Sequence, residues 1–134
     1  MTIMYIDFYA RSEKVNFDFS DLISCGSIDK NNIGDVNKRR NVIIPDCNWS
    51  CITEKKHDRY IDSNDLLREF FEKIQPNLEQ IKERINRLNL DVGLCVVVEK
   101  ECAEDDYSLT VSKEMIHFLN EINASLEFDL YIEP

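Results

Sequence analysis

The chain has 134 residues, the usual size of one domain and enough to bury a hydrophobic core. It carries 26 acidic residues against 16 Lys and Arg, a formal net charge of −10 at pH 7. This balance argues against proteins that bind nucleic-acid phosphates or anionic membranes. Hydrophobic residues make up 43% and aromatic residues 10%, which excludes wholesale disorder. We therefore expect a single domain over residues 1–134 that binds neither nucleic acid nor membranes.

The negative charge is concentrated in the last third of the chain. Residues 1–88 contain 15 acidic and 14 basic residues, whereas residues 89–134 contain 11 acidic residues and two lysines. A negative surface can serve solubility alone. Concentrated in one segment, it also fits an acidic surface that binds a basic partner.

The cysteines and the first residues indicate a cytoplasmic protein. The five cysteines are odd in number and irregularly spaced, which fits reduced thiols better than a disulfide framework. The first residues lack a basic segment and Asp7 interrupts their apolar stretch, so we expect no signal peptide. The longest strictly apolar run, 94–98, is far shorter than the roughly 20 residues that span a bilayer.

In chain order, the first predicted element is a strand over residues 3–10 with alternating faces, of which the face without Asp7 is the better core candidate. Residues 20–24 predict a short helix. Residues 27–47 are polar and predict a long loop. Residues 48–54 predict a second strand.

The clearest helical pattern follows. Apolar residues recur at intervals of three and four over 66–74 and again over 78–88. Ser63 or Asn64 is placed to cap the first of these helices. Pro76 disfavours the helical conformation of the residue before it, so we expect two helices or one broken helix.

Two more strands and a helix complete the chain. Residues 90–98 predict a mostly apolar strand. Ser112 is a good N-cap for a helix with apolar residues from Met115 to Ile122. Apolar and polar residues alternate strictly over 124–133, which predicts a strand with a well-specified register. Most of the strands have one polar face. The pattern predicts an α+β fold: a two-layer sandwich with an about four-stranded mixed or antiparallel sheet and helices packed on one face.

The other face of this sheet should meet water or a partner. If the two end strands lie close together, that face is acidic and rich in tyrosine. Tyrosine supplies rigid apolar area with a polar tip, and carboxylates attract a basic partner. The face would collect Tyr5, Asp7, Tyr9, Asp91, Glu99, Glu127, Asp129, Tyr131 and Glu133. With the acidic loop 99–106, the candidate partner-binding residues are Tyr5, Asp7, Tyr9, Glu99, Glu101, Glu104, Asp105, Asp106, Glu127, Asp129, Tyr131 and Glu133.

Motifs for catalysis or cofactor binding do not emerge from the sequence. Cys47 and Cys51 form the closest cysteine pair, but on a strand they stand about 13 Å apart, too far to share a zinc ion. His57 and His117 are isolated, and neither a G-x-S-x-G motif nor a phosphate-binding glycine loop can be written. We assign no catalytic residue, cofactor or metal, and the sequence favours a non-enzymatic protein.

Two alternatives stay open. One is a small carboxylate- or metal-dependent enzyme that uses loop 99–106 or the terminal strand; a histidine beside a cysteine in a deep pocket would support it. The other is a homo-oligomeric structural module that pairs through an exposed sheet edge.

Several features also occur in a familiar order: Gly26, then Trp49-Ser50 on a strand, the paired helices over 66–88, the segment 108–112 that leads into a helix, and the closing Asp129-x-Tyr131. Together they resemble the bacterial domain-of-unknown-function family 4279. The chain departs from the family pattern at residues 25–30 and at Asn123-Ala124. The resemblance implies a small α+β domain and no established catalytic residues.

We interpret the sequence as that of a non-enzymatic protein-binding module. The most concrete form is a bacterial immunity-type inhibitor that neutralises a basic toxin domain through an acidic, tyrosine-containing face. Small size, acidity concentrated in one third of the chain and the lack of catalytic motifs support this interpretation. The sequence does not define the oligomeric state.

Overall fold

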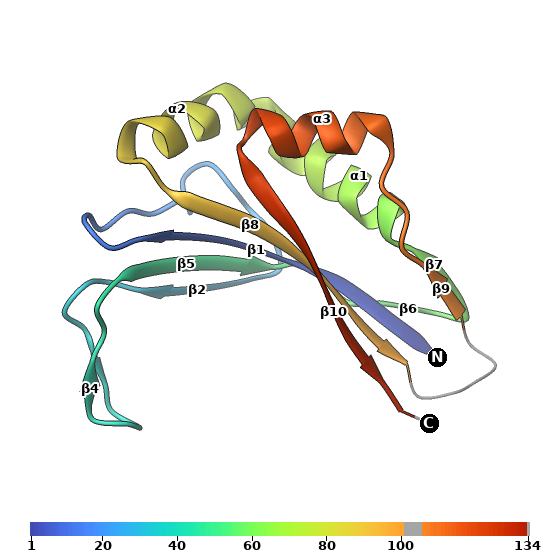
Figure 1. Ribbon diagram of the computed structural model, residues 1–134, viewed down its shortest axis with the longest axis horizontal. Helices are drawn as coiled ribbons and strands as arrows, with labels where there is room; N and C mark the ends of the chain where they lie inside the picture. The colour runs from blue at the N-terminus through green and yellow to red at the C-terminus, as the bar shows by residue number, and fades with distance from the viewer. Residues whose placement is uncertain (101–105, 134) are drawn as a thin grey trace.

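The computed structural model describes residues 1–100 and 106–133, which form two layers. One layer is a mixed sheet of six strands, and α-helices cover one of its faces (Figure 1). The strands from edge to edge are β10 (Ala124–Ile132), β8 (Asp91–Lys100), β1 (Thr2–Ser12), β5 (Cys47–Ile52) and β2 (Ser27–Asn31). β6 (Lys56–Asp58) pairs with β1 beyond the end of β5. The α+β sandwich is confirmed, with a larger sheet than the four strands expected.

The strand β1 lies at the centre of the sheet. It pairs antiparallel with β8 on one side and with β5 on the other. β10 pairs with β8 in parallel. A parallel neighbour requires a crossover, and α3 (Lys113–Glu121) lies within the connection between these two strands.

The helix layer begins as the apolar periodicity predicts. α1 (Ser63–Ile74) and α2 (Leu78–Leu88) are separated by a 3-10 turn, Gln75–Asn77, which contains Pro76. Asp62 caps α1 in place of the predicted Ser63 or Asn64, because its side chain accepts a hydrogen bond from the Asn64 N–H. Ser112 caps α3 as predicted. None of the described helices is long and apolar enough to cross a membrane.

The core lies between the two layers. Met4, Ile6 and Phe8 of β1 are fully buried. The ring of Phe8 lies 6.1 Å from that of Trp49 and 5.5 Å from that of Phe70, so the aromatic cluster joins β1, β5 and α1. Full burial of one such side chain contributes about 1.5–3 kcal/mol.

Residues 19–47 differ from the expectation. Residues 19–23 form a turn in which Phe19 C=O accepts from two N–H groups, rather than a helix. The expected loop contains β2 and a hairpin of β3 (Val36–Asn37) and β4 (Val42–Ile43) that projects from the body (Figure 1). β2 has little burial on either face, so its sequence lacks the usual alternation, and backbone pairing with β5 defines it.

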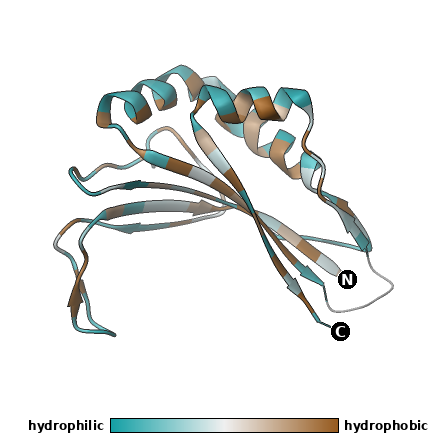
Figure 2. Ribbon diagram, in the orientation of Figure 1, coloured by the Kyte–Doolittle hydropathy of each residue, from teal (hydrophilic) through white to brown (hydrophobic). Residues whose placement is uncertain are grey.

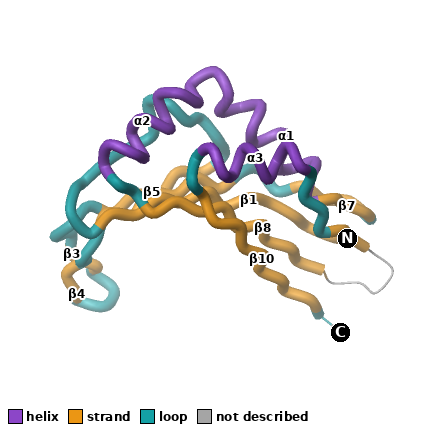
Figure 3. The backbone as a smooth tube through the Cα atoms, turned by 45° about the horizontal axis from the view of Figure 1, so that its top comes forward, coloured by secondary structure: helices purple, strands orange, loops and turns teal. Residues whose placement is uncertain are grey.

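The edge strand β10 alternates as predicted, but its apolar side is only partly covered. Leu126 packs against the core, whereas Phe128, Leu130 and Ile132 are 39%, 43% and 50% exposed. The strand starts at α3 and runs past the helix layer (Figure 3), and apolar positions continue along it (Figure 2). The apolar side of β10 therefore packs against the core only in its N-terminal half.

The cysteines also differ from the expectation of reduced thiols. Cys25 and Cys51 are paired as a disulfide, with Cα atoms 6.2 Å apart, a separation typical of such bonds. Cys47 is buried and free, and Cys95 is partly exposed and free. The spacing of the cysteines in the sequence did not predict this pair, because it is the fold that brings Cys25 next to Cys51 on β5.

Candidate functional site

The sheet face opposite the helices carries most of the predicted acidic and tyrosine side chains. In the register of the three strands, Asp7 of β1 lies beside Cys95 of β8, which lies beside Glu127 of β10. The rows on either side are Tyr9–Gly93–Ser125 and Tyr5–Val97–Asp129. The next row is Ile3–Glu99–Tyr131. We call this surface the acidic face and define it by Tyr5, Asp7, Tyr9, Glu99, Glu127, Asp129 and Tyr131.

Asp7 stands at the centre of the acidic face. Its Oδ1 is buried and lacks a hydrogen-bond partner within the described residues. Burial, reinforced by the negative charge of Glu127, raises the pKa of the Asp7 carboxyl. An unsatisfied carboxylate in this position adds negative potential to the face at a cost in stability.

Cys95 shares this environment. Burial, followed by the charges of Asp129, Glu127 and Asp7, raises the pKa of its thiol to about 11. Such a thiol stays protonated near neutral pH and is a poor nucleophile. The Cys95 thiol at the centre of the acidic face is therefore poorly suited to nucleophilic catalysis.

Tyr9 spans the face because Gly93 has no side chain. The Tyr9 hydroxyl donates to Glu127 Oε1, two strands away. A Cβ on Gly93 would overlap the Tyr9 hydroxyl and lie 2.8 Å from its Cε1. The ring thus lies directly over β8, as occurs where a strand glycine allows another group to approach closely. This hydrogen bond, chiefly, raises the pKa of Tyr9 and fixes the position of the Glu127 carboxylate.

The other two tyrosines surround Asp129. The Tyr131 hydroxyl donates to Asp129 Oδ2 at 2.8 Å, and this bond raises the pKa of Tyr131. Burial and then the charges of Glu99, Asp7 and Asp129 raise the pKa of Tyr5. The Lys55 ammonium lies 5.1 Å from the centre of the Tyr5 ring, at the margin of the face. Each tyrosine therefore stays neutral beside a carboxylate and offers apolar area next to negative charge.

Among the residues that the structure describes, the carboxylates of the acidic face form no ion pair with lysine or arginine, unlike many acids elsewhere. Arg84 pairs with Asp21 at 2.7 Å, and Arg87 pairs with Glu83 at 2.8 Å. Within residues 1–100 and 106–133, no lysine or arginine forms an ion pair with Asp7, Glu99, Glu127 or Asp129. Within the described residues, the negative charge of this face is therefore not neutralised by ion pairs.

Not every predicted site residue lies on this face. Glu133 follows β10 and its N–H donates to Lys100 C=O at 2.9 Å. Asp106 begins β9 (Asp106–Ser108), which pairs with β7 (Tyr60–Asp62). The Asp106 C=O accepts a hydrogen bond from the hydroxyl of Thr2, a buried residue on the helix side of the sheet. The structure therefore separates Asp106 from the acidic face. The predicted residues Glu101, Glu104 and Asp105 lie outside the described residues.

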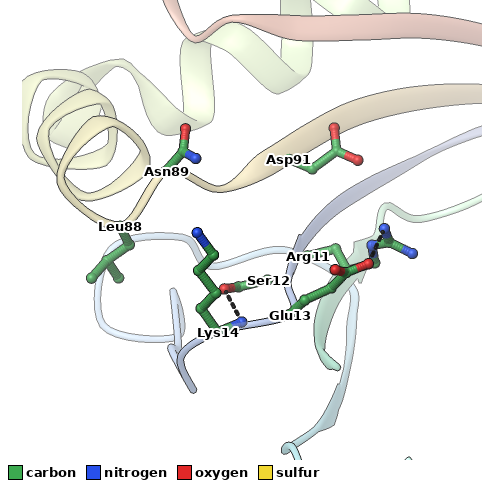
Figure 4. A pocket seen from close by; sticks show the side chains of 7 residues that line it. All are labelled: Arg11, Ser12, Glu13, Lys14, Leu88, Asn89 and Asp91. Carbon is green, nitrogen blue, oxygen red and sulfur yellow. Dashed lines mark hydrogen bonds and ion pairs between the residues drawn. The ribbon is translucent and has the colours of Figure 1, made fainter. Parts of the chain in front are cut away.

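Asp91 lies at one end of the face, opposite Arg11 in the register of β1 and β8. Both line a shallow depression between the end of β1 and the start of β8 (Figure 4). Arg11 is already engaged, by Glu13 at 3.2 Å and by Asp46 at 3.3 Å. The lining mixes both charges, so it does not select one kind of ligand.

The two histidines lie away from the acidic face. His57 lines a groove with residues 56–69 that contains no cysteine. His117 is exposed and lies 2.8 Å from Glu121 on the same helix. The described residues contain no group of three or more His, Cys, Asp or Glu side chains arranged to hold a metal ion.

Sequence reasoning missed the contribution of Gly93 and Cys95. The alternation that puts Val92, Leu94 and Val96 in the core also places these two residues on the opposite side. A signal for Cys95 was therefore present. The role of Gly93 required the tertiary register, because Tyr9 is distant in sequence.

The structure defines a small two-layer α+β protein with one open, acidic sheet face. The chain belongs to the family described as "Domain of unknown function (DUF4279)", whose model matches residues 16–133. No curated protein and no solved structure is significantly similar to the chain. The match includes Glu99, Glu127, Asp129 and Tyr131 but starts after β1, so Tyr5, Asp7 and Tyr9 lie outside it.

Proposed function

We propose that this protein is a non-enzymatic binding module that neutralises a basic protein, most concretely an immunity-type inhibitor of a bacterial toxin domain. One observation carries the proposal: within the described residues, the carboxylates of the acidic face form no ion pair with lysine or arginine, and they are interleaved with tyrosines on a rigid sheet. Complementary charge speeds association and selects the partner, while tyrosines supply contact area at little entropic cost.

The placement of the acidic face supports binding rather than catalysis. Catalytic carboxylates need surroundings that exclude water from the substrate, and an open sheet face is better suited to a broad protein interface. The raised pKa of Cys95 also disfavours a thiolate at this position. A cytoplasmic location is part of the proposal and requires the Cys25–Cys51 pair to be reduced there, because cytosolic thiols are kept reduced.

The test measures the affinity of the purified protein for a panel of basic nuclease toxin domains, with an unrelated basic protein as control. A toxin domain that binds should do so more weakly as salt rises. The double variant Glu127→Lys/Asp129→Lys should weaken this binding at least about tenfold, mainly through slower association.

The matched control is Glu72→Lys/Glu114→Lys, which makes the same change of net charge on the exposed side of the helix layer. It should leave the affinity within about twofold, because exposed charges on the far side are screened. Equal weakening by both double variants, or an affinity that does not respond to salt, would contradict the proposal.

A further inference from the structure

The outer edge of β10 pairs with no strand that the structure describes. Among the described residues, β10 pairs only with β8. The strand has 9 residues, which is long for an unprotected edge, and it contains neither the lysine nor the proline that commonly blocks one. A long free edge of this kind is a template for another strand.

The free backbone groups of this edge belong to the apolar residues of β10. The Glu133 N–H points to β8, since it donates to Lys100 C=O. Backbone groups of successive residues in a strand point to opposite sides. Those of Phe128, Leu130 and Ile132 therefore point outward, where an added strand would pair with them.

The helix side of this edge is apolar from one end to the other. At the start of β10 a groove runs beside α3, lined by Val111, Ile116, Leu119, Asn120, Ala124 and Leu126. Ile116 is 56% exposed. Beyond the groove, the exposed side chains of Phe128, Leu130 and Ile132 continue the apolar side. An added strand would cover these side chains with alternate residues of its own.

The opposite side of the same edge is acidic. Glu127 and Asp129 point to the acidic face and are exposed. We propose that the free edge of β10 binds an extended segment in which basic and apolar residues alternate, by strand addition to the sheet. The basic side chains would meet Glu127 and Asp129, and the apolar side chains would meet Phe128 and Leu130. This inference rests on the proposed function and specifies how the basic partner is held.

In a register centred on Phe128, charge favours such a segment over a second copy of this chain. Antiparallel pairing of two β10 strands about Phe128 would place Glu127 of one copy opposite Asp129 of the other. Like charges directly opposite each other destabilise strand pairing. A strand with lysine or arginine at those positions converts the repulsion into attraction.

The test uses a capped peptide of about seven residues in which lysine and valine alternate, and a block peptide of the same composition as control. Binding to the full chain is followed by fluorescence anisotropy at low salt. Leu130→Pro removes one outward N–H and obstructs the edge, while Leu130→Ala removes the side chain and keeps the N–H. We expect Leu130→Pro to bind the alternating peptide about tenfold more weakly than Leu130→Ala. The block peptide should bind the unmodified chain more weakly than the alternating peptide.

Amide hydrogen exchange tests the proposal without any variant. The amides of Phe128 and Leu130 should exchange more slowly when the alternating peptide binds, whereas those of Glu127 and Asp129 are already paired with β8. No added protection at Phe128 and Leu130 would overturn strand addition, even if Leu130→Pro failed to fold.

Other outcomes separate this inference from the proposed function. Equal affinity of Leu130→Pro and Leu130→Ala would overturn strand addition, and Glu127→Lys/Asp129→Lys would then still test the acidic face. If that double variant leaves peptide binding unchanged, the electrostatic proposal fails as well. A dimer in light scattering that Leu130→Pro makes monomeric would identify a second copy as the occupant and overturn the inference.

Discussion

Replacement of Gly93 by alanine tests how the acidic face is held together. The added Cβ would occupy the space of the Tyr9 ring, which crosses β8 at that point to reach Glu127. Tyr9 and Gly93 are register partners, so the backbones of β1 and β8 cannot move apart at this point without breaking hydrogen bonds in the centre of the sheet. Tyr9 must therefore swing away from Glu127.

The expected cost follows from what the displaced ring loses. The hydrogen bond to Glu127 lies at the surface, so its loss costs about 1 kcal/mol. Uncovering the half-buried ring adds about 1 kcal/mol. Alanine is better than glycine in a strand by about 0.5–1 kcal/mol, which offsets part of this. The net loss is about 1–1.5 kcal/mol, a fall of roughly 3–5 °C in Tm for a chain of this length.

A double-mutant cycle checks the explanation by urea unfolding. In a Tyr9→Ala background the ring is gone, so Gly93→Ala should stabilise the protein by about 0.5–1 kcal/mol. In a Tyr9→Phe background the ring remains, so Gly93→Ala should still destabilise it. The reasoning is refuted if Gly93→Ala has the same cost with and without the Tyr9 ring, or no cost in the unmodified chain.

Three further predictions concern stability. Burial and the charge of Glu127 raise the pKa of Asp7 in the folded state, so the folded state binds the Asp7 proton more tightly than the unfolded state does. The free energy of unfolding therefore falls as the pH rises from the unfolded-state pKa to the raised folded-state pKa. At pH values above this range, Asp7→Asn should therefore raise Tm, whereas well below about pH 3.5 it should leave Tm unchanged. Scanning calorimetry across pH measures both, and a rise in Tm that does not depend on pH would contradict this explanation. The Cys25–Cys51 bond joins residues that are 26 positions apart in the sequence. Cys25→Ser should therefore lower the free energy of unfolding by about 3 kcal/mol under oxidising conditions and by little after reduction. Alkylation of Cys25 in the folded, unreduced protein would argue against the bond. Ser112→Ala should lower the free energy of unfolding by about 1 kcal/mol in urea titrations, since Ser112 accepts from the Met115 N–H, and an unchanged midpoint would show that this cap is dispensable.

The helices and the long strands could be predicted because their own residues determine them. The apolar residues that recur at intervals of three and four over 66–74 and 78–88 predicted α1 and α2, and Pro76 predicted the break between these helices. Strict alternation gave β1 and β10 together with the side that each turns to the helices. In these segments, local propensity and burial agree, so the pattern is visible in one window of sequence.

The edges of the fold could not be predicted in this way. β2 has little burial on either face, and its partner β5 supplies the hydrogen bonds that make it a strand. The pairing of Cys25 with Cys51 depends on a turn that the sequence indicated as a helix. The exposure of Phe128 and Leu130 depends on where the helix layer ends, which no residue of β10 encodes.

By itself, the sequence determined that the acidic side chains of β1 and β10 point away from the core, because their alternation with buried apolar residues leaves them no other side. Only the tertiary structure decided that they form one surface. It placed β8 between the two strands, so that Asp7, Cys95 and Glu127 fall in one row, and it put Gly93 where the Tyr9 ring must cross. It also left Asp106 on the helix side. Strand order and register depend on contacts between residues far apart in the chain, and these decide which charges lie close enough to act together.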